Sequence, residues 1–146
     1  MRRDPCLIPL SHQHHNGLAL CVMTRRSLAA DPSAGNVAGL AERAIARYEV
    51  ELANHFEIEE QVLFPLCAPA PLVALLVEDH RTMEGQIAQL RWAPTAALLE
   101  QFCALLSAHI RREENELFEE IQRALPREVL DRAGVEIERR AVRVCL

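Results

Sequence analysis

The chain has 146 residues, and half of them are hydrophobic, so it can bury the core of one ordinary domain without disulfide crosslinks. Sixteen basic and twenty-one acidic side chains give a net charge of -5, and the basic residues form no cluster longer than a pair, which argues against nucleic acid as a partner. No apolar stretch has the length of a signal peptide or approaches the roughly 20 residues of a membrane span, so we expect a single cytoplasmic domain, residues 1–146, with no membrane association.

The spacing of apolar residues predicts an all-helical protein. They recur at three- and four-residue intervals over long stretches, and glycine and proline gather in a few breaks. Short connections between long helices favour antiparallel neighbours, so we expect an antiparallel up-down-up-down four-helix bundle with a short C-terminal extra helix. The predicted helices run from about Ser11 to Ala30, from about Val37 to Leu66, from about Leu72 to Arg91 and from about Ala96 to Leu125, and the extra helix starts at Pro126.

Two polar residues interrupt the apolar stripe of the second predicted helix. Steps of three and four residues place His55 and Glu59 on the inward face of this helix. A buried ionised carboxylate without a partner costs several kcal/mol or more, so Glu59 needs a cation nearby. The complete stripe is Ala41, Ile45, Tyr48, Leu52, His55, Glu59, Val62 and Leu66.

The fourth predicted helix repeats this pattern with His109 and Glu113 among apolar residues. Both helices have the sequence His-x3-Glu-Glu-x2-Leu-Phe, beginning at His55 and at His109. Four residues advance about 6 Å along a helix and overshoot one turn by about 40°, so the histidine and glutamate of each segment can bind the same ion or adjacent ions. The inward stripe here is Leu99, Phe102, Leu106, His109, Glu113, Leu117 and Ile121.

The first predicted helix offers three histidines near its start. His15 lies on one stripe with Leu18 and Val22, so we select it as the inward residue. His12 lies one turn earlier on a similar face and is the substitute, whereas His14 is expected to be a solvated residue of the first turn.

The third predicted helix contributes His80, which falls between Leu76 and Met83 on an apolar stripe. Glu84 follows His80 by one turn and is a candidate seventh ligand, although Met83 fits the inward stripe as well or better, which would turn Glu84 to a flank. The predicted metal ligands are therefore His15, His55, Glu59, His80, Glu84, His109 and Glu113.

These residues resemble the hemerythrin-like family, also called the HHE cation-binding domain, from Leu10 to about Leu125. The most specific similarity is in the two segments that begin at His55 and His109; the Ser11-x2-His14-His15-x2-Leu18 and Glu78-Asp79-His80 segments support it. The resemblance implies an antiparallel four-helix bundle with two non-haem irons, bridged by Glu59 and Glu113 and bound by histidines that match His15, His55, His80 and His109.

The main departure of the chain from the family pattern is at the position of Glu84. Oxygen-carrying members have a second histidine four residues after the one that matches His80, and this chain has Glu84 there. A carboxylate ligand adds negative charge and favours Fe(III), so reversible oxygen carriage should be weakened.

Three further side chains near the stripes have ordinary interpretations. Glu60 and Glu114 are turned about 100° from the inward stripe, so we expect them to be solvated or salt-bridged. Tyr48 is expected to be a core residue, with a hydrogen bond to a bound oxygen species as the alternative. Because the chain has few aromatic residues, the walls of the site are expected to be aliphatic.

The predicted function is that of a non-haem diiron protein that binds dioxygen or a related small oxidant, such as nitric oxide or peroxide, for sensing, storage or protection. One alternative is a diiron enzyme that removes peroxide or nitric oxide. Another is a helical interaction module in which the metal, for example zinc, only staples the helices. The amphipathic segment around Val129 to Val142 is expected to pack either on the bundle or on a second subunit, which would make a homodimer.

Overall fold

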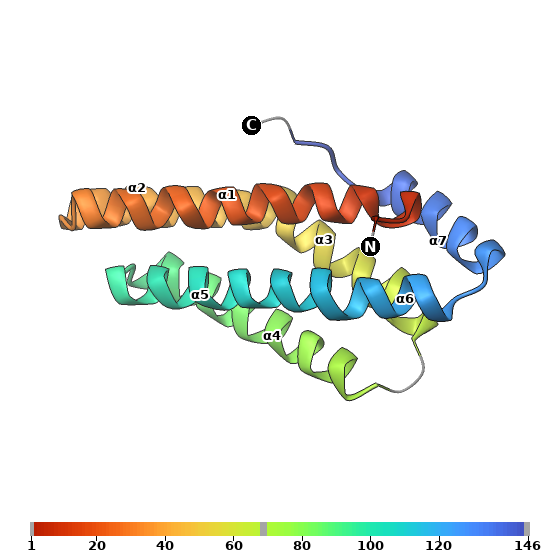
Figure 1. Ribbon diagram of the computed structural model, residues 1–146. Helices are drawn as coiled ribbons and strands as arrows, with labels where there is room; N and C mark the ends of the chain where they lie inside the picture. Colours follow the sequence, from red (N-terminus) through yellow and green to blue (C-terminus); the bar gives the residue numbers. More distant parts are fainter. Residues whose placement is uncertain (1, 68–69, 145–146) are drawn as a thin grey trace.

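The computed structural model describes residues 2–67 and 70–144, and all regular secondary structure within those ranges is helical. This confirms the predicted all-α class. The elements join into five continuous helices, and we call the first four of them rods (Figure 1). The first rod comprises η1 (Pro5–Leu7) and α1 (Ile8–Ala30); the second comprises α2 (Ala34–Arg47), η2 (Tyr48–Leu52), α3 (Ala53–Ile58), η3 (Glu59–Leu63) and η4 (Phe64–Leu66). The third rod is α4 (Pro71–Trp92), the fourth comprises α5 (Ala96–Arg112), η5 (Glu113–Leu117) and α6 (Phe118–Ala124), and the fifth helix is α7 (Arg127–Arg140).

Polar side chains cap the starts of three rods. Asp4 caps the first rod, Ser33 the second and Thr95 the fourth, and each side-chain oxygen accepts a hydrogen bond from a backbone N–H two or three residues later. The Asp4 cap lets the first rod begin before the predicted start at Ser11.

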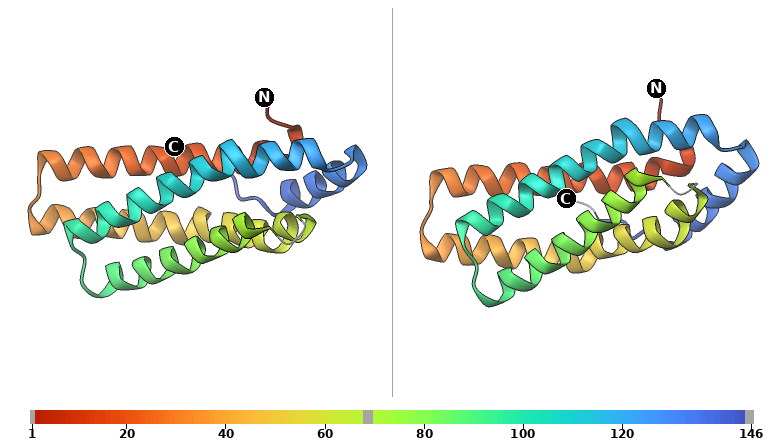
Figure 2. Two further views of the ribbon diagram at one scale, coloured as in Figure 1. Left: turned by 60° about the horizontal axis from the view of Figure 1, so that its bottom comes forward. Right: turned by 90° about the horizontal axis from the view of Figure 1, so that it is seen from below.

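The rods lie side by side, and successive rods run in opposite directions (Figure 2). Helix α1 packs against α2 and α5, and α4 packs against the same two helices. Helix α7 packs on η1 and η3, at the end of the molecule where α1 begins, and residues 141–144 run from it back along α1 (Figure 1). In the described part of the chain, no helix is both long and apolar enough to cross a membrane.

Two apolar clusters divide the core along its length. One contains Leu52 of the second rod and Leu106 of the fourth; the other contains Leu63 and Leu117 of the same two rods, together with residues of η1 and α7. A polar layer lies between the clusters, because the residues between these pairs of leucines include His55, Glu59, His109 and Glu113. Similarly, His14 lies between Leu10 and Leu20, and His80 lies between Leu76 and Met83.

Candidate metal centre

Six ionisable side chains meet in this polar layer, and each is at most 3% exposed. They are His14 of the first rod, His55 and Glu59 of the second, His80 of the third, and His109 and Glu113 of the fourth. They form two overlapping groups in which all the ligand atoms lie within 4.8 Å of one another. Both groups contain Glu59 and Glu113; one adds His14 and His55, and the other adds His80 and His109.

Each shared glutamate opens a π turn in its rod. The backbone N–H of Phe64 donates to the carbonyl oxygen of Glu59, and the N–H of Phe118 donates to that of Glu113. These bonds close wider turns than α-helical ones, and such turns occur often at functional sites. The two His-x3-Glu segments therefore have the same backbone geometry as well as the same sequence pattern.

The π turns also change which residues face the core. Leu63 is 1% exposed, whereas Val62, which the predicted stripe places inward, is only partly buried. A turn with one extra residue brings side chains four apart onto one face, so Leu63 follows Glu59 just as Leu117 follows Glu113.

In the first group, the imidazole Nε2 atoms face the shared carboxylates. His14 Nε2 lies 3.0 Å from Glu113 Oε1. His55 Nε2 lies 2.6 Å from Glu59 Oε1 and 3.8 Å from Glu113 Oε1.

The second group repeats this arrangement. His109 Nε2 lies 3.1 Å from Glu113 Oε1, and His80 Nε2 lies 3.8 Å from Glu59 Oε1. The two Nε2 atoms of His80 and His109 are 3.2 Å apart. All four Nε2 atoms thus converge on the two carboxylates from four different rods.

The Nδ1 atom of each ligand imidazole contacts an oxygen on a different rod. These contacts are 2.7 to 3.0 Å long and join His14 to Glu114, His55 to Gln13, His80 to Glu60 and His109 to Asp79. Each supporting side chain is the sequence neighbour of a ligand on its own rod. The contacts therefore form a closed ring, in which the first rod supports the second, the second the third, the third the fourth, and the fourth the first.

This ring fixes what the imidazoles can do chemically. When each Nδ1–H donates its hydrogen to the outer oxygen, each Nε2 directs a lone pair toward the shared carboxylates. Lone pairs and carboxylates at these distances repel one another unless a cation lies between them.

Several buried atoms in the layer have no hydrogen-bond partner among the described residues. His55 Nε2 and Glu59 Oε1 are only 2.6 Å apart, yet they lack hydrogen-bond alignment, and Glu59 Oε2 and Glu113 Oε2 are unpaired too. Unpaired buried polar atoms of this kind are costly, and a metal ion would satisfy them together. The residues present therefore fit a metal site.

Burial favours the neutral form of two of the imidazoles. It lowers the pKa of His14, and it lowers the pKa of His109 to about 4, although nearby carboxylates oppose both shifts. Burial by itself would raise the pKa of Glu59, but the proximity of His55, and then of His80 and His109, lowers it to about 2. Neutral imidazoles and ionised carboxylates are the forms that bind metal ions.

The structure places His14, and not His15, in this layer. His14 is 3% exposed, whereas His15 and the substitute His12 are both exposed and lie outside the two groups. The inward histidine of the first helix is therefore one position before the residue that the sequence predicted.

The reason lies in the residue types on the inward face of α1. That face includes small and polar residues, so apolarity alone misplaces it. At Gly17, one turn after His14, α1 lies close to α5: a Cβ atom there would lie 3.1 Å from Ile110 Cδ1. The buried residues of α1 are Leu10, Gln13, His14, Asn16, Gly17, Leu20, Cys21, Thr24 and Leu28.

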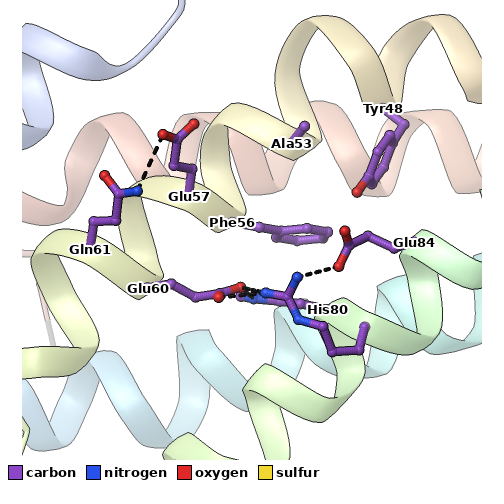
Figure 3. A pocket seen from close by; sticks show the side chains of 9 residues that line it. Tyr48, Ala53, Phe56, Glu57, Glu60, Gln61, His80 and Glu84 are labelled. Carbon is purple, nitrogen blue, oxygen red and sulfur yellow. Dashed lines mark hydrogen bonds and ion pairs between the residues drawn. The ribbon is translucent and has the colours of Figure 1, made fainter.

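Glu84 lies outside both groups and lines a surface pocket of about 280 Å³ beside His80 (Figure 3). Its side chain is 45% exposed and forms an ion pair with Arg81, while Met83 fills the inward position. Tyr48 and Phe56 line the same pocket, and burial raises the pKa of Tyr48. Tyr48 therefore borders this pocket and, as the sequence predicted, also packs against the apolar core.

Phenylalanine rings pack on the imidazoles, although the low aromatic content predicted aliphatic walls. The ring of Phe56 stacks on His80 with centroids 4.0 Å apart, and Phe64 stacks on the same imidazole at 5.8 Å. Phe118 stacks on His14 at 5.3 Å. Stacked rings hold the imidazole planes in place and exclude water from them.

Sequence reasoning also missed the supporting role of the outer residues. Glu60 and Glu114 form the expected salt bridges, with Arg81 and Arg3, but they also bond the imidazoles of His80 and His14. Adjacency to a ligand is the one signal in the sequence that points to them.

The fold and this layer define an all-helical protein with buried histidine and glutamate groups that are compatible with a metal site. The chain matches the family described as the hemerythrin HHE cation binding domain over residues 8–121, with a second match over residues 71–140. It therefore belongs to this family, as the sequence predicted. Searches of curated proteins and of solved structures found no match.

Proposed function

We propose that the chain is a non-haem diiron protein that binds dioxygen or a related small oxidant, such as nitric oxide or peroxide, for sensing, storage or protection. The observation that carries this proposal is the pair of overlapping ligand groups that share Glu59 and Glu113. Two groups with shared carboxylates suit a pair of ions at adjacent positions. We interpret the rods as the antiparallel up-down-up-down four-helix bundle that the sequence predicts, with α7 as the extra helix.

The proposed ligands differ from the predicted set at two positions. His14 takes the place of His15 because the His14 side chain lies inside the buried layer. Glu84 is left out because its side chain lies outside this layer. Glu59 and Glu113 would bridge the ions, and two imidazoles would hold each of them. The proposed set is His14, His55, Glu59, His80, His109 and Glu113.

Iron fits this donor set and supplies redox chemistry. Imidazole nitrogen and carboxylate oxygen are ligands that suit iron, and bound Fe(II) supplies electrons to an oxidant, which zinc and magnesium do not. Two imidazoles and two shared carboxylates would give each ion few protein ligands, which would leave room for a small molecule to bind iron.

The protein around the centre would orient the ligands and control access to them. The outer contacts fix the imidazole planes, and the phenylalanine rings keep water away from them. A small molecule would approach the centre through the pocket beside His80, whose volume of about 280 Å³ exceeds what a diatomic gas requires.

The test is iron content together with an optical spectrum, recorded on the anaerobically reduced protein and again after air is admitted. A pair of irons per chain and new charge-transfer bands that reverse when oxygen is removed are expected for an oxygen-binding protein. Bands that appear irreversibly would support the enzymatic alternative instead. Little bound iron and no response to oxygen would refute the proposed function.

A further inference from the structure

A chain of hydrogen bonds links the segment after α7 to a proposed metal ligand. The Nε2 amide of Gln13 donates to the backbone carbonyl oxygen of Val142 at 3.2 Å. Gln13 Oε1 lies 2.9 Å from His55 Nδ1, and Gln13 is 1% exposed. The backbone of Val142 is therefore only one side chain away from the His55 imidazole.

Asn54 connects the same partners a second time. Its Oδ1 atom accepts from Gln13 Nε2 at 3.1 Å and from the backbone N–H of Val142 at 3.0 Å. Its Nδ2 atom donates to the backbone carbonyl oxygen of Arg140 at 2.9 Å. Asn54 is thus held by the end of α7 and by the segment after it, and it holds Gln13 in turn.

These bonds determine which way the Gln13 amide points. Both of its N–H groups face acceptors, Asn54 Oδ1 and the Val142 carbonyl oxygen, so its oxygen must face His55. A flipped amide would lose both of those bonds and would present a donor to His55 Nδ1. The amide oxygen is an acceptor, so His55 must donate its Nδ1–H and keep the lone pair of Nε2 for a metal.

The segment itself is held weakly enough to respond to the site. Residues 141–144 have no regular secondary structure, and none of them is buried. Besides the bonds of Val142, the Ala141 N–H donates to the carbonyl oxygen of Ile137, Arg143 forms an exposed ion pair with Glu138, and a contact of 3.4 Å joins Asn16 Nδ2 to the carbonyl oxygen of Val144. Segments with few buried contacts open at low free-energy cost, so a small coupling can shift their docking.

We propose that docking of residues 141–144 positions His55 through Gln13 and Asn54, so that docking of this segment and metal binding strengthen each other. The inference rests on the proposed metal site. Reciprocity follows from linkage, since a docked segment that raises metal affinity must itself be docked more firmly when metal is bound. The other three imidazoles bond to side chains of the rods and do not depend on the segment.

The matched pair Val142→Pro and Val142→Ala tests this inference. Proline removes the backbone N–H that Asn54 accepts, and alanine keeps it. Residue Ala141 has φ -67° and ψ 124°, a conformation that a residue before proline readily adopts, so the substitution does not oblige Ala141 to change. A second variant, Asn54→Ala, removes the bridge from the other side without altering the segment.

Two readouts are combined on the whole protein, with Fe(II) added under anaerobic conditions as the probe. One is Fe(II) affinity measured by competition with a chelator, and the other is hydrogen exchange of the amides of residues 141–144 with and without Fe(II). We expect Val142→Pro and Asn54→Ala to weaken binding of one ion by about 10-fold, while Val142→Ala binds as the unmodified protein does. We also expect Fe(II) to slow exchange in this segment of the unmodified protein and not in Asn54→Ala.

The outcomes separate this inference from the proposed function. If the unmodified protein binds Fe(II) but its segment exchanges equally fast with and without the metal, the coupling is wrong and the metal site stands. Unchanged affinity in both Val142→Pro and Asn54→Ala would overturn the coupling in the same way. If the unmodified protein binds no Fe(II), both proposals fail.

Discussion

The two histidine pairs of the proposed centre, His80 with His109 and His14 with His55, share their carboxylates but differ in their surroundings. His80 borders the surface pocket, with Phe56 stacked on its imidazole. His55 instead faces Gln13 and, through it, the segment after α7. One pair therefore lies beside a surface pocket, and the other is linked to the segment after α7.

The outer partners of the two pairs differ in charge. Carboxylates bond to the Nδ1 atoms of His80, His109 and His14, whereas a neutral amide bonds to that of His55. A carboxylate partner makes an imidazole a stronger base and a stronger metal ligand. We therefore expect the ion between His14 and His55 to be bound less tightly than the ion between His80 and His109.

Arginines accompany the carboxylates and limit their charge. Glu60 pairs with Arg81, Glu114 with Arg3 at 2.7 Å, and Asp79 with Arg112 at 3.2 Å. The arginine charges offset the negative charge that the supporting carboxylates bring near the centre. His55 needs no such arginine, because its partner is neutral.

The largest expected effect comes from a ligand that both pairs share. Glu113→Gln should weaken binding of both ions by more than about 100-fold, because loss of an outer partner alone costs up to that much. Iron content after dialysis and chelator competition measure it. The matched control is Glu116→Gln, an exposed residue of the same π turn, which should bind iron normally. Retention of both ions by Glu113→Gln would contradict a shared carboxylate.

A change confined to one pair should remove one ion. His14→Ala deletes an imidazole of the weaker pair, so we expect one ion to be lost while the ion between His80 and His109 remains. His15→Ala is the control, since His15 is exposed, and it should retain both ions. Loss of one ion in His15→Ala but not in His14→Ala would instead support His15, the ligand that the apolar stripe predicts.

Much of the fold follows from the sequence because its helices obey simple rules. The predicted breaks fall within a few residues of the observed ends of α1, α4 and α6, because proline, glycine and capping residues act locally. The inward positions of His109 and Glu113 were likewise predictable, because the apolar stripe of their helix continues with regular spacing before and after them.

The remaining features depend on contacts between rods, which a single helix does not reveal. Gln13 and Asn16 are buried because residues far along the chain satisfy their amides, so the inward face of α1 looks polar in the sequence. A fixed spacing of three and four residues does not allow for the extra residue of the π turn at Glu59. Because of this extra residue, Leu63 rather than Val62 faces the core. Gly17 was the available signal for the correct face of α1.

The difference between carboxylate and amide support can be tested directly. Asp79→Asn keeps an acceptor for His109 Nδ1 but removes the charge that strengthens it as a ligand. We expect the tighter ion to be weakened by about 10-fold, which would bring its affinity closer to that of the other ion. Chelator titration of Asp79→Asn should show two dissociation steps that lie closer together than in the unmodified protein. Glu78→Gln, at the exposed neighbouring position, is the control.

The smallest effect is expected at the pocket that distinguishes the His80 side. Glu84→Ala removes an exposed ion pair with Arg81, and such pairs contribute at most about 1 kcal/mol to stability. Because Met83, and not Glu84, faces the core, iron content and the spectrum of the reduced protein should be unchanged. Glu60 retains its contacts with His80 and Arg81 in this variant, so the ring of outer contacts stays closed. A loss of one ion, or a shifted spectrum, would show that Glu84 turns inward to bind metal.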